Sequence, residues 1–245
     1  MDPIKNILIV IAMEAEAAPI IEALGLKKDD PSRINGPAPC EAFSGTFAGV
    51  SVTIVHNGKD PSHGVDNVGT VPAALTAYIA IQAYKPDLLI SAGTAGGFKA
   101  KGGEIGDVYV STACVNHDRR IPLPGFDEYG LGIKQSASTE NLQAELPVKN
   151  GVVSSGNSLD YTDKCLEIMK ENFAAVKEME AAGIAWVADI CKVPMFCVKA
   201  ITDIVDGGRP SQEEFMENLS SAAQSLKSML PKVLEFVANK KLMEL

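Results

Sequence analysis

The chain has 245 residues, of which 46% are hydrophobic and 22% charged, a composition typical of an ordinary globular enzyme. The formal net charge of −9, with no basic cluster larger than two adjacent residues, opposes a nucleic-acid or polyphosphate partner. We therefore expect a single globular domain over residues 1–245 and no nucleic-acid binding.

Neither a membrane segment nor a metal site is indicated. The apolar run at 7–12 is far shorter than a membrane span and has no signal-peptide cleavage pattern after it. The cysteines are scattered without C-x-x-C spacing, and the histidines form no H-x-x-x-H pair. We expect no membrane partner, no metal, reduced and mostly buried thiols, and a cytoplasmic location.

In the first part of the chain, strands and helices alternate. A continuous apolar run predicts a buried strand over 6–12, and apolar residues at helical spacing predict a helix over 14–26. We expect an irregular loop over 27–40, a hairpin of strands 42–47 and 50–55, a flexible turn over 57–69 and a helix over 70–85. Glu14 and Glu16 fall in the first turn of the first helix, where the macrodipole favours negative charge. That dipole accounts for one carboxylate, and the pair marks a candidate site.

A glycine-rich stretch follows the next predicted strand. The strand is Asp87–Ser91, and Ala92–Gly97 comes directly after it as a turn. Its glycines let the backbone approach a ligand and point N–H groups at it, and Thr94 adds a hydroxyl. The spacing matches neither a dinucleotide fingerprint nor a Walker loop, so a dinucleotide or triphosphate is not indicated.

In the second part, strands are expected over 105–116 and 148–155, separated by a charged loop at 117–124 that is either surface decoration or a lid. A helix over 161–173, a short extended segment at 174–177 and a helix over 181–191 follow, and we expect the last of these to be buried nearly all round. A final helix starts at 210, with Ser211 as a candidate cap and Pro231 expected to kink or divide it. The alternation predicts an α/β fold around a largely parallel, mixed sheet.

The last predicted strand, Val193–Asp203, ends in a carboxylate. Ligands of open α/β sheets bind at the carboxyl ends of strands, so Asp203, with Thr202 beside it, is a candidate acid or base. A helix cap or a turn-forming aspartate is the alternative interpretation. Glu178 and Glu180 precede a buried helix, a position that is unfavourable for charge unless partners satisfy it.

Five motifs at strand ends, taken in order, resemble the methylthioadenosine/S-adenosylhomocysteine nucleosidases over nearly the whole chain. They are Ala12–Glu16, Ser91–Gly97, Ser155–Leu159, Glu178–Glu180 and Ala200–Asp203. The stretches 71–74 and 118–122 resemble the plant-type members. The resemblance implies a nucleoside-phosphorylase-like fold, a three-layer α/β/α sandwich around a mixed, mostly parallel sheet. It also implies a hydrolase without a metal or organic cofactor, which cleaves 5′-methylthioadenosine to adenine and 5-methylthioribose in methionine salvage.

The same resemblance implies roles for individual residues. Asp203 would protonate N7 of adenine with help from Thr202, and Glu16 would act as the general base for water. The implied substrate contacts are Glu180 at the ribose hydroxyls, Met179 against the sugar, Thr94 near ribose and water, Leu159 over the adenine face, backbone groups of Asp160 at the base edge, and Lys199 near the water.

Several positions depart from the family pattern. Leu159 stands where many bacterial relatives carry Phe, which leaves less aromatic stacking, and Lys199 replaces an Arg and loses its planar fork. Asn157 stands where Asp is usual, and 181–183 is Ala-Ala-Gly rather than a Gly/Ala-Ala pattern. We expect altered affinity or packing from these changes rather than loss of the reaction.

Two other functions stay open from the sequence. One is a phosphorylase of purine nucleosides or methylthioadenosine, although Glu14 and Glu16 would repel phosphate. The other is a non-catalytic nucleoside-binding or storage protein of the same fold. From the family we expect an adenine nucleoside as the small-molecule partner and a homodimer, in which residues 121–124 of one subunit close the 5′ pocket of the other. Whether S-adenosylhomocysteine is accepted stays open.

Overall fold

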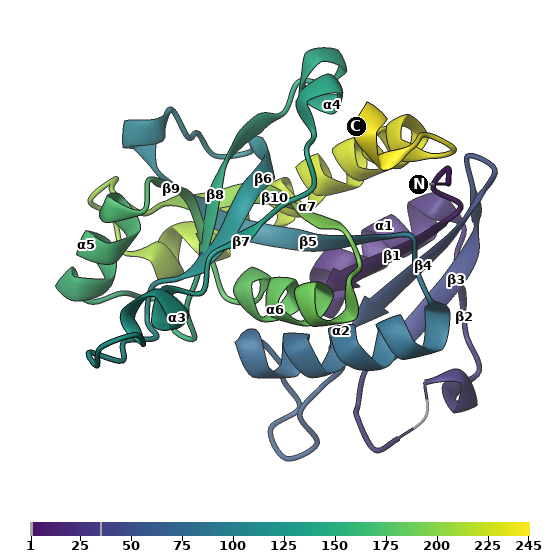
Figure 1. The fold of residues 1–245 in the computed structure, drawn as a ribbon, viewed down its shortest axis with the longest axis horizontal. Coiled ribbons are helices and arrows are strands. Elements are labelled where there is room, and N and C mark those ends of the chain that lie inside the picture. The colour runs from purple at the N-terminus through teal and green to yellow at the C-terminus, as the bar shows by residue number, and fades with distance from the viewer. Residues whose placement is uncertain (1, 35) are drawn as a thin grey trace.

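One mixed β-sheet occupies the middle of the molecule, with helices on both sides (Figure 1). The computed structural model describes residues 2–34 and 36–245, so Asn35 of the predicted loop at 27–40 lies outside the described residues. The strands are β1 (Asn6–Ile11), β2 (Lys27–Lys28), β3 (Glu41–Phe47), β4 (Val50–His56), β5 (Leu88–Gly97), β6 (Val108–Asn116), β7 (Lys134–Gln135), β8 (Lys149–Ser155), β9 (Ala174–Glu178) and β10 (Met195–Ile204). The α-helices are α1 (Glu14–Leu24), α2 (Thr70–Tyr84), α3 (Asp127–Leu131), α4 (Glu140–Glu145), α5 (Asp163–Glu171), α6 (Ala181–Cys191) and α7 (Ser211–Val237).

The sheet mixes parallel and antiparallel pairs. β1 pairs in parallel with β4 and β5, as do β5 with β10, β6 with β8, and β8 with β9. The pairs β3–β4, β5–β9 and β6–β10 are antiparallel. Because β10 pairs with both β5 and β6, the strands β5, β9, β8, β6 and β10 close into a ring. The sequence predicted the mixed sheet but not this closure.

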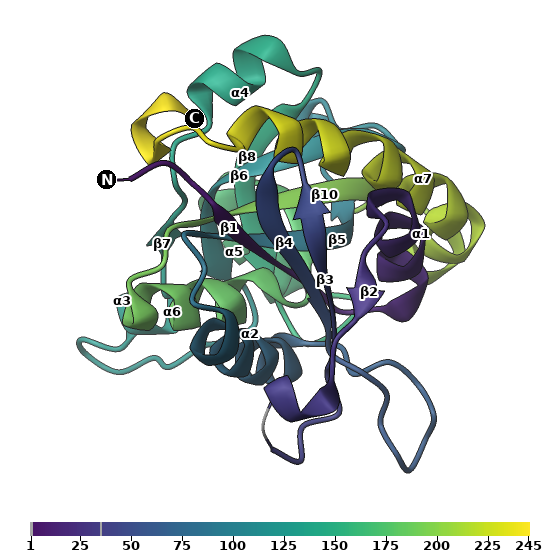
Figure 2. The ribbon, with the colours of Figure 1, turned by 90° about the vertical axis from the view of Figure 1, so that its right-hand side faces the viewer.

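Two helical layers cover the sheet, which confirms the predicted three-layer arrangement. Along β1, Ile7, Ile9 and Ile11 face the layer that contains α7, and Leu8 and Val10 face the layer that contains α2 and α6. Figure 2 shows α1 and α7 on one side of the strands and α2 and α6 on the other. A strand buried on both faces needs an apolar residue at every position, which explains the uninterrupted hydrophobic run.

The glycine-rich segment is not the predicted turn. β5 continues through Gly97, and its last residues pair with β10 on one side and with β9 on the other. Glu178 similarly closes β9 instead of opening a helix. Both changes arise because the ring of strands supplies hydrogen-bond partners that the local sequence does not reveal.

The final helix also differs from the prediction. Pro210 is the residue that precedes α7, and Ser211 is its first helical residue, with no side-chain cap at this end. The helix continues past Pro231 as one element to Val237. Ser211 is therefore not the cap that the sequence suggested.

Helix α6 is not buried all round, contrary to expectation. An apolar face runs over α2 and α6, which pack side by side, and each of its five large side chains is at least 47% exposed: Val71, Leu75, Tyr78, Trp186 and Ile190. Exposed apolar surface of this kind marks an interaction site. Within residues 2–34 and 36–245, no helix combines the length and the apolar character needed to cross a membrane.

Candidate active site

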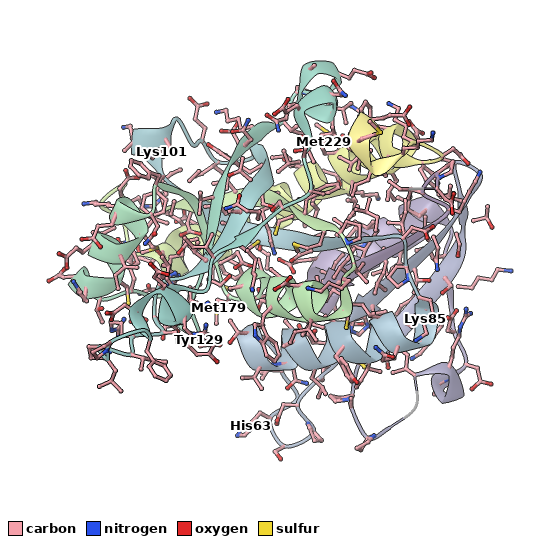
Figure 3. The ribbon with its side chains drawn as sticks, viewed as in Figure 1. His63, Lys85, Lys101, Tyr129, Met179 and Met229 are labelled. Atoms are coloured by element: carbon pink, nitrogen blue, oxygen red, sulfur yellow. The ribbon has the colours of Figure 1, made fainter. Side chains whose placement is uncertain are left out.

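A cavity of about 240 Å³ lies near the carboxyl ends of β1, β5, β9 and β10. Its walls bring together all the predicted site residues except Asp160 and Lys199. The lining residues are Ala12, Met13, Glu16, Val68, Thr94, Ala95, Gly96, Leu159, Lys177, Glu178, Met179, Glu180, Thr202, Asp203 and Phe215. Figure 3 labels Met179 beside the amino end of α6, where this part of the chain leaves β9.

Other hollows have larger volumes, and two of them are lined by residues that offer less chemistry. One, of about 810 Å³, is lined by serines of α7 and by Asp107 and Lys149, which pair with each other at 2.6 Å. The other, of about 460 Å³, lies between α2, α3 and α6. The smaller cavity holds the buried carboxylates Glu16 and Asp203, each 4% exposed. Buried ionisable groups with shifted pKa values mark functional sites, so we assign the site to this cavity.

Glu16 reaches the cavity from the first turn of α1, against the backbone of β5. Its Oε1 accepts hydrogen bonds from the backbone N–H of Thr94 at 2.7 Å and from the Thr94 hydroxyl at 2.5 Å. Gly93 makes room for it, because a Cβ there would lie 3.3 Å from Glu16 Oε2. Burial raises the pKa of Glu16, while the Thr94 donors and Lys199 act in the opposite direction. The carboxylate is thus poised to take up a proton.

Glu14 does not share this position. Its carboxylate is exposed and pairs with Lys59 Nζ at 2.7 Å, and the residue does not line the cavity. The predicted pair of carboxylates is therefore split between the surface and the site. Of the two carboxylates, Glu16 is the one that lines the cavity.

Asp203 reaches the cavity from the end of β10. This strand pairs with β5, which carries Thr94. Its register partner is Gly96 of β5, where a Cβ would lie 2.8 Å from Asp203 Oδ2. Thr202 Oγ1 lies 2.8 Å from Asp203 Oδ1. Burial raises the pKa of Asp203, which favours the protonated form that a general acid needs. As a strand residue, Asp203 is neither the helix cap nor the turn residue of the alternative interpretation.

Behind the cavity, Glu178 and Lys199 form a buried ion pair with 3.0 Å between Oε2 and Nζ. The Glu178 carboxylate also accepts hydrogen bonds from the Ser155 hydroxyl and from the Ala181 backbone N–H. Burial would raise the pKa of Glu178, but Lys199 and Ser155 hold it below its usual value. Glu178 lines the cavity, whereas Lys199, only 1% exposed, does not.

Glu180 occupies a different electrostatic environment two residues later. Burial and the nearby Glu178 raise the pKa of Glu180 to about 7. Its Oε1 accepts a hydrogen bond from the Gly69 backbone N–H at 2.8 Å. The Glu180 carboxyl group can therefore accept hydrogen bonds from hydroxyl groups when it is ionised and donate one when it is protonated.

Lys177 is the main cavity residue that the sequence interpretation missed. It is 5% exposed and donates to the backbone carbonyls of Ser158 at 3.1 Å and Leu159 at 2.7 Å. Leu159 itself lines the cavity, whereas Asp160 is exposed outside it. The available signal was a lysine that directly follows three apolar residues in the segment predicted to be extended.

The remaining cavity walls are apolar, and they include Met13, Val68 and Phe215, none of which the sequence predicted as site residues. Among the described residues, no group of three or more His, Cys, Asp or Glu side chains is arranged to hold a metal ion. The chemistry available in the cavity is therefore that of carboxylates, hydroxyls and one ammonium group.

Comparison with known proteins defines the class. The model of the phosphorylase superfamily matches residues 6–235. The 5′-methylthioadenosine nucleosidase of Arabidopsis thaliana is 43% identical over 243 residues, which cover 99% of this chain and 91% of the relative. The 5′-methylthioadenosine/S-adenosylhomocysteine nucleosidase of the same plant is 47% identical, covering 99% of this chain and 96% of the relative.

Solved structures agree with the sequence matches. The apo structure of the Arabidopsis thaliana 5′-methylthioadenosine nucleosidase superposes with a TM-score of 0.97 over 99% of this chain and 100% of that one, at 43% identity. The chain belongs to the phosphorylase superfamily and, within it, to the 5′-methylthioadenosine/S-adenosylhomocysteine nucleosidases of the plant type represented by these relatives.

Proposed function

We propose that this protein hydrolyses the N-glycosidic bond of 5′-methylthioadenosine and releases adenine and 5-methylthioribose. The observation that carries the proposal is the presence of two buried carboxylates, Glu16 and Asp203, in one cavity. Burial raises the pKa of both carboxyl groups, so each is suited to exchange a proton, and the backbone N–H and hydroxyl of Thr94 fix Glu16 in place. The nucleosidase relatives at 43% and 47% identity support the same reaction.

The proposed step balances around a single water molecule. Asp203 gives its proton to N7 of adenine, and the electron pair of the C1′–N9 bond moves to the departing base. The water oxygen forms a bond to C1′ as positive charge develops on the ribose, and Glu16 accepts the proton that the water loses. Return of a proton from Glu16 to Asp203 through solvent completes the cycle.

We assign the other predicted site residues to the substrate, of which Asp160 and Lys199 lie outside the cavity lining. Glu180 binds the ribose hydroxyls, Met179 packs against the sugar and Thr94 lies near the ribose and the water. Leu159 covers the adenine face, Thr202 holds the Asp203 carboxyl and backbone groups at Asp160 read the base edge. Lys199 lies behind the cavity and is paired with Glu178, so we assign it an indirect role on the water side, in which it holds that carboxylate in place.

Hydrolysis is favoured over phosphorolysis by the charges near the water side. The Lys199 ammonium is neutralised by Glu178 at 3.0 Å, and Glu16 and Glu180 add further carboxylates. A phosphate dianion would meet this acidic wall at a high electrostatic cost, whereas water does not.

Product analysis tests the proposed reaction. The purified protein is incubated with 5′-methylthioadenosine in phosphate-free buffer and in phosphate, and the sugar product is identified by mass. We expect adenine and free 5-methylthioribose under both conditions, with equal rates. A requirement for phosphate, with 5-methylthioribose 1-phosphate as product, would make the protein a phosphorylase, and S-adenosylhomocysteine in a parallel reaction establishes whether that nucleoside is accepted.

We further propose a homodimer that buries the apolar face of α2 and α6. The five exposed side chains named for that face support it, as does the exposed Leu123 in the segment 121–124 that we expect to close the partner's 5′ pocket. Sedimentation should give a dimer for the parent and a monomer for Leu75→Glu. A monomeric parent at assay concentration would contradict the proposal.

A single cooperative domain and a cytoplasmic location in methionine salvage complete the proposal. The cysteines are unpaired in the structure, which suits a reducing compartment. One thermal transition for the whole chain would support the single domain, and cell fractionation would test the location.

A further inference from the structure

Lys177, Gly96 and Asp203 lie in one row across three neighbouring strands. Gly96 of β5 is the register partner of Lys177 in β9 and of Asp203 in β10. Gly96 has no side chain, and a Cβ at this position would lie 2.8 Å from Asp203 Oδ2. The ammonium and the carboxyl group therefore face the same cavity from the two sides of a glycine.

The ammonium group of Lys177 is held in place by the backbone. It donates to two consecutive carbonyl oxygens, those of Ser158 and Leu159, at 3.1 and 2.7 Å. The side chain is only 5% exposed, so most of its hydration is lost. Burial lowers the pKa of Lys177, and Asp203 is the largest influence in the opposite direction. A lysine without an acidic neighbour would be expensive to keep in this position.

The charges around Asp203 come from several elements. Lys177 faces it from β9 and Glu214 from α7, with the hydroxyls of Thr202 and Ser211 beside it. Tyr161 and Asp206 lie in the same region, and Glu214 is itself near Arg209, at 3.7 Å. Among these groups, Lys177 is the one whose positive charge acts on the Asp203 carboxyl.

We propose that Lys177 is a positioning residue for the general acid: its ammonium fixes the segment that carries Leu159 and stabilises the Asp203 carboxylate left after proton transfer to the base. This inference rests on the proposed hydrolysis and adds a residue to it. When Asp203 gives its proton to N7 of adenine, a negative charge appears on a buried side chain. A fixed cation near that charge lowers the barrier, because it needs no reorganisation during the step.

The test separates charge from hydrogen bonding. Lys177→Gln keeps an N–H donor for the carbonyls and removes the charge, whereas Lys177→Arg keeps both. Titration of the Asp203 carboxyl is followed by NMR in protein labelled with carbon-13 at the aspartate carboxyls, with Asp203→Asn to assign the signal. The pH profile of kcat with 5′-methylthioadenosine is measured on the same variants.

We expect the Asp203 midpoint to rise by about one pH unit in Lys177→Gln and to stay in place in Lys177→Arg. In Lys177→Gln, the alkaline limb of the kcat profile should move to higher pH by a similar amount, and kcat on the plateau should fall by about tenfold. Lys177→Met repeats the test if the Gln variant does not fold.

Contrary results are distinct from failure of the hydrolysis itself. If activity fell while the titration midpoint of Asp203 stayed in place, Lys177 would serve only to hold the segment 158–159. That result would overturn the proposal. If the parent released no adenine, the proposed hydrolysis would fail, and the NMR titration would still decide whether Lys177 acts on Asp203.

Discussion

Lys199 Nζ lies 3.0 Å from Glu178 Oε2, in an ion pair of which Glu178 lines the cavity and Lys199 does not. Both side chains are buried. Removing one partner of a buried pair leaves an uncompensated charge, so Lys199→Met should lower the free energy of unfolding by about 3–5 kcal/mol. Urea unfolding measures it, with Lys192→Met at the exposed pair with Asp189 as a control of little effect. Equal losses in the two variants would contradict this account of the pair.

Thr94 should control the acid limb of the activity profile. Glu16 must be ionised to accept a proton from water, so activity is lost as the pH falls through its pKa. The Thr94 hydroxyl lowers that pKa, and Thr94→Val should move the acid limb of kcat up by about one pH unit. Thr53→Val, at a buried threonine of β4 outside the cavity, should leave the limb in place. An unchanged limb in Thr94→Val would remove Thr94 from this role.

Glu180 should make the protein less stable as the pH rises. Its pKa is raised from 4.5 to about 7 in the folded protein, so the folded state holds the proton more tightly than the unfolded chain. The associated stability is complete below about pH 4.5 and is lost as the pH rises towards 7.

Glu180→Gln cannot ionise and should therefore be more stable than the parent at pH 8, by about 1–3 kcal/mol, but not at pH 4.5. Urea titrations at the two pH values check this, and the same variant should raise KM through loss of the ribose contact. A stability difference that is the same at both pH values would show that ionisation of Glu180 is not its source.

Asn157 uses both ends of its side-chain amide to join two parts of the chain. Its Oδ1 accepts hydrogen bonds from the backbone N–H and the hydroxyl of Thr70, the first residue of α2, each at 2.9 Å. Its Nδ2 donates to Asp118 Oδ2 at 3.2 Å. Asn157→Ala should lower stability by about 1 kcal/mol through the lost helix-end acceptor.

In Asn157→Asp the acceptor for Thr70 is kept, but the amide NH₂ that donates to Asp118 is replaced by a carboxylate oxygen. We therefore expect Asn157→Asp to be destabilised as well, because two carboxylates then lie side by side. Thermal unfolding of both variants at pH 8 measures this. An Asp variant as stable as the parent at pH 8 would show that Asp118 is not its electrostatic partner.

The sequence could place the two carboxylates proposed as base and acid at one edge of the sheet, because each one is positioned by local structure. Glu16 follows an apolar strand by a few residues, and Asp203 stands near the end of another, so both reach the edge of the sheet where ligands bind. Glu14 looked equivalent to Glu16 in the sequence. Glu14 instead pairs with Lys59, which is distant in the sequence and comes close only when the chain folds.

Features that depend on long-range pairing were missed. Ala92–Gly97 was interpreted as a turn because it is rich in glycine, but β9 and β10 pair with it and make it strand. The burial of Lys177 likewise follows from closure of the five-strand ring, which leaves no signal in a short segment of sequence. The exposed face of α6 was missed because exposed apolar residues such as Trp186 and Ile190 look the same in the sequence as core residues.

Adenine release from 5′-methylthioadenosine by Glu16→Gln and Asp203→Asn, measured beside the parent in phosphate-free buffer, tests the central claim most directly. Glu14→Gln is the matched control, because it makes the same change two residues away at a surface ion pair. We expect both site variants to lose about 10²–10⁴-fold in kcat while the control keeps the parental rate. Parental rates in the site variants, or an equal loss in Glu14→Gln, would contradict the assignment of base and acid to this cavity.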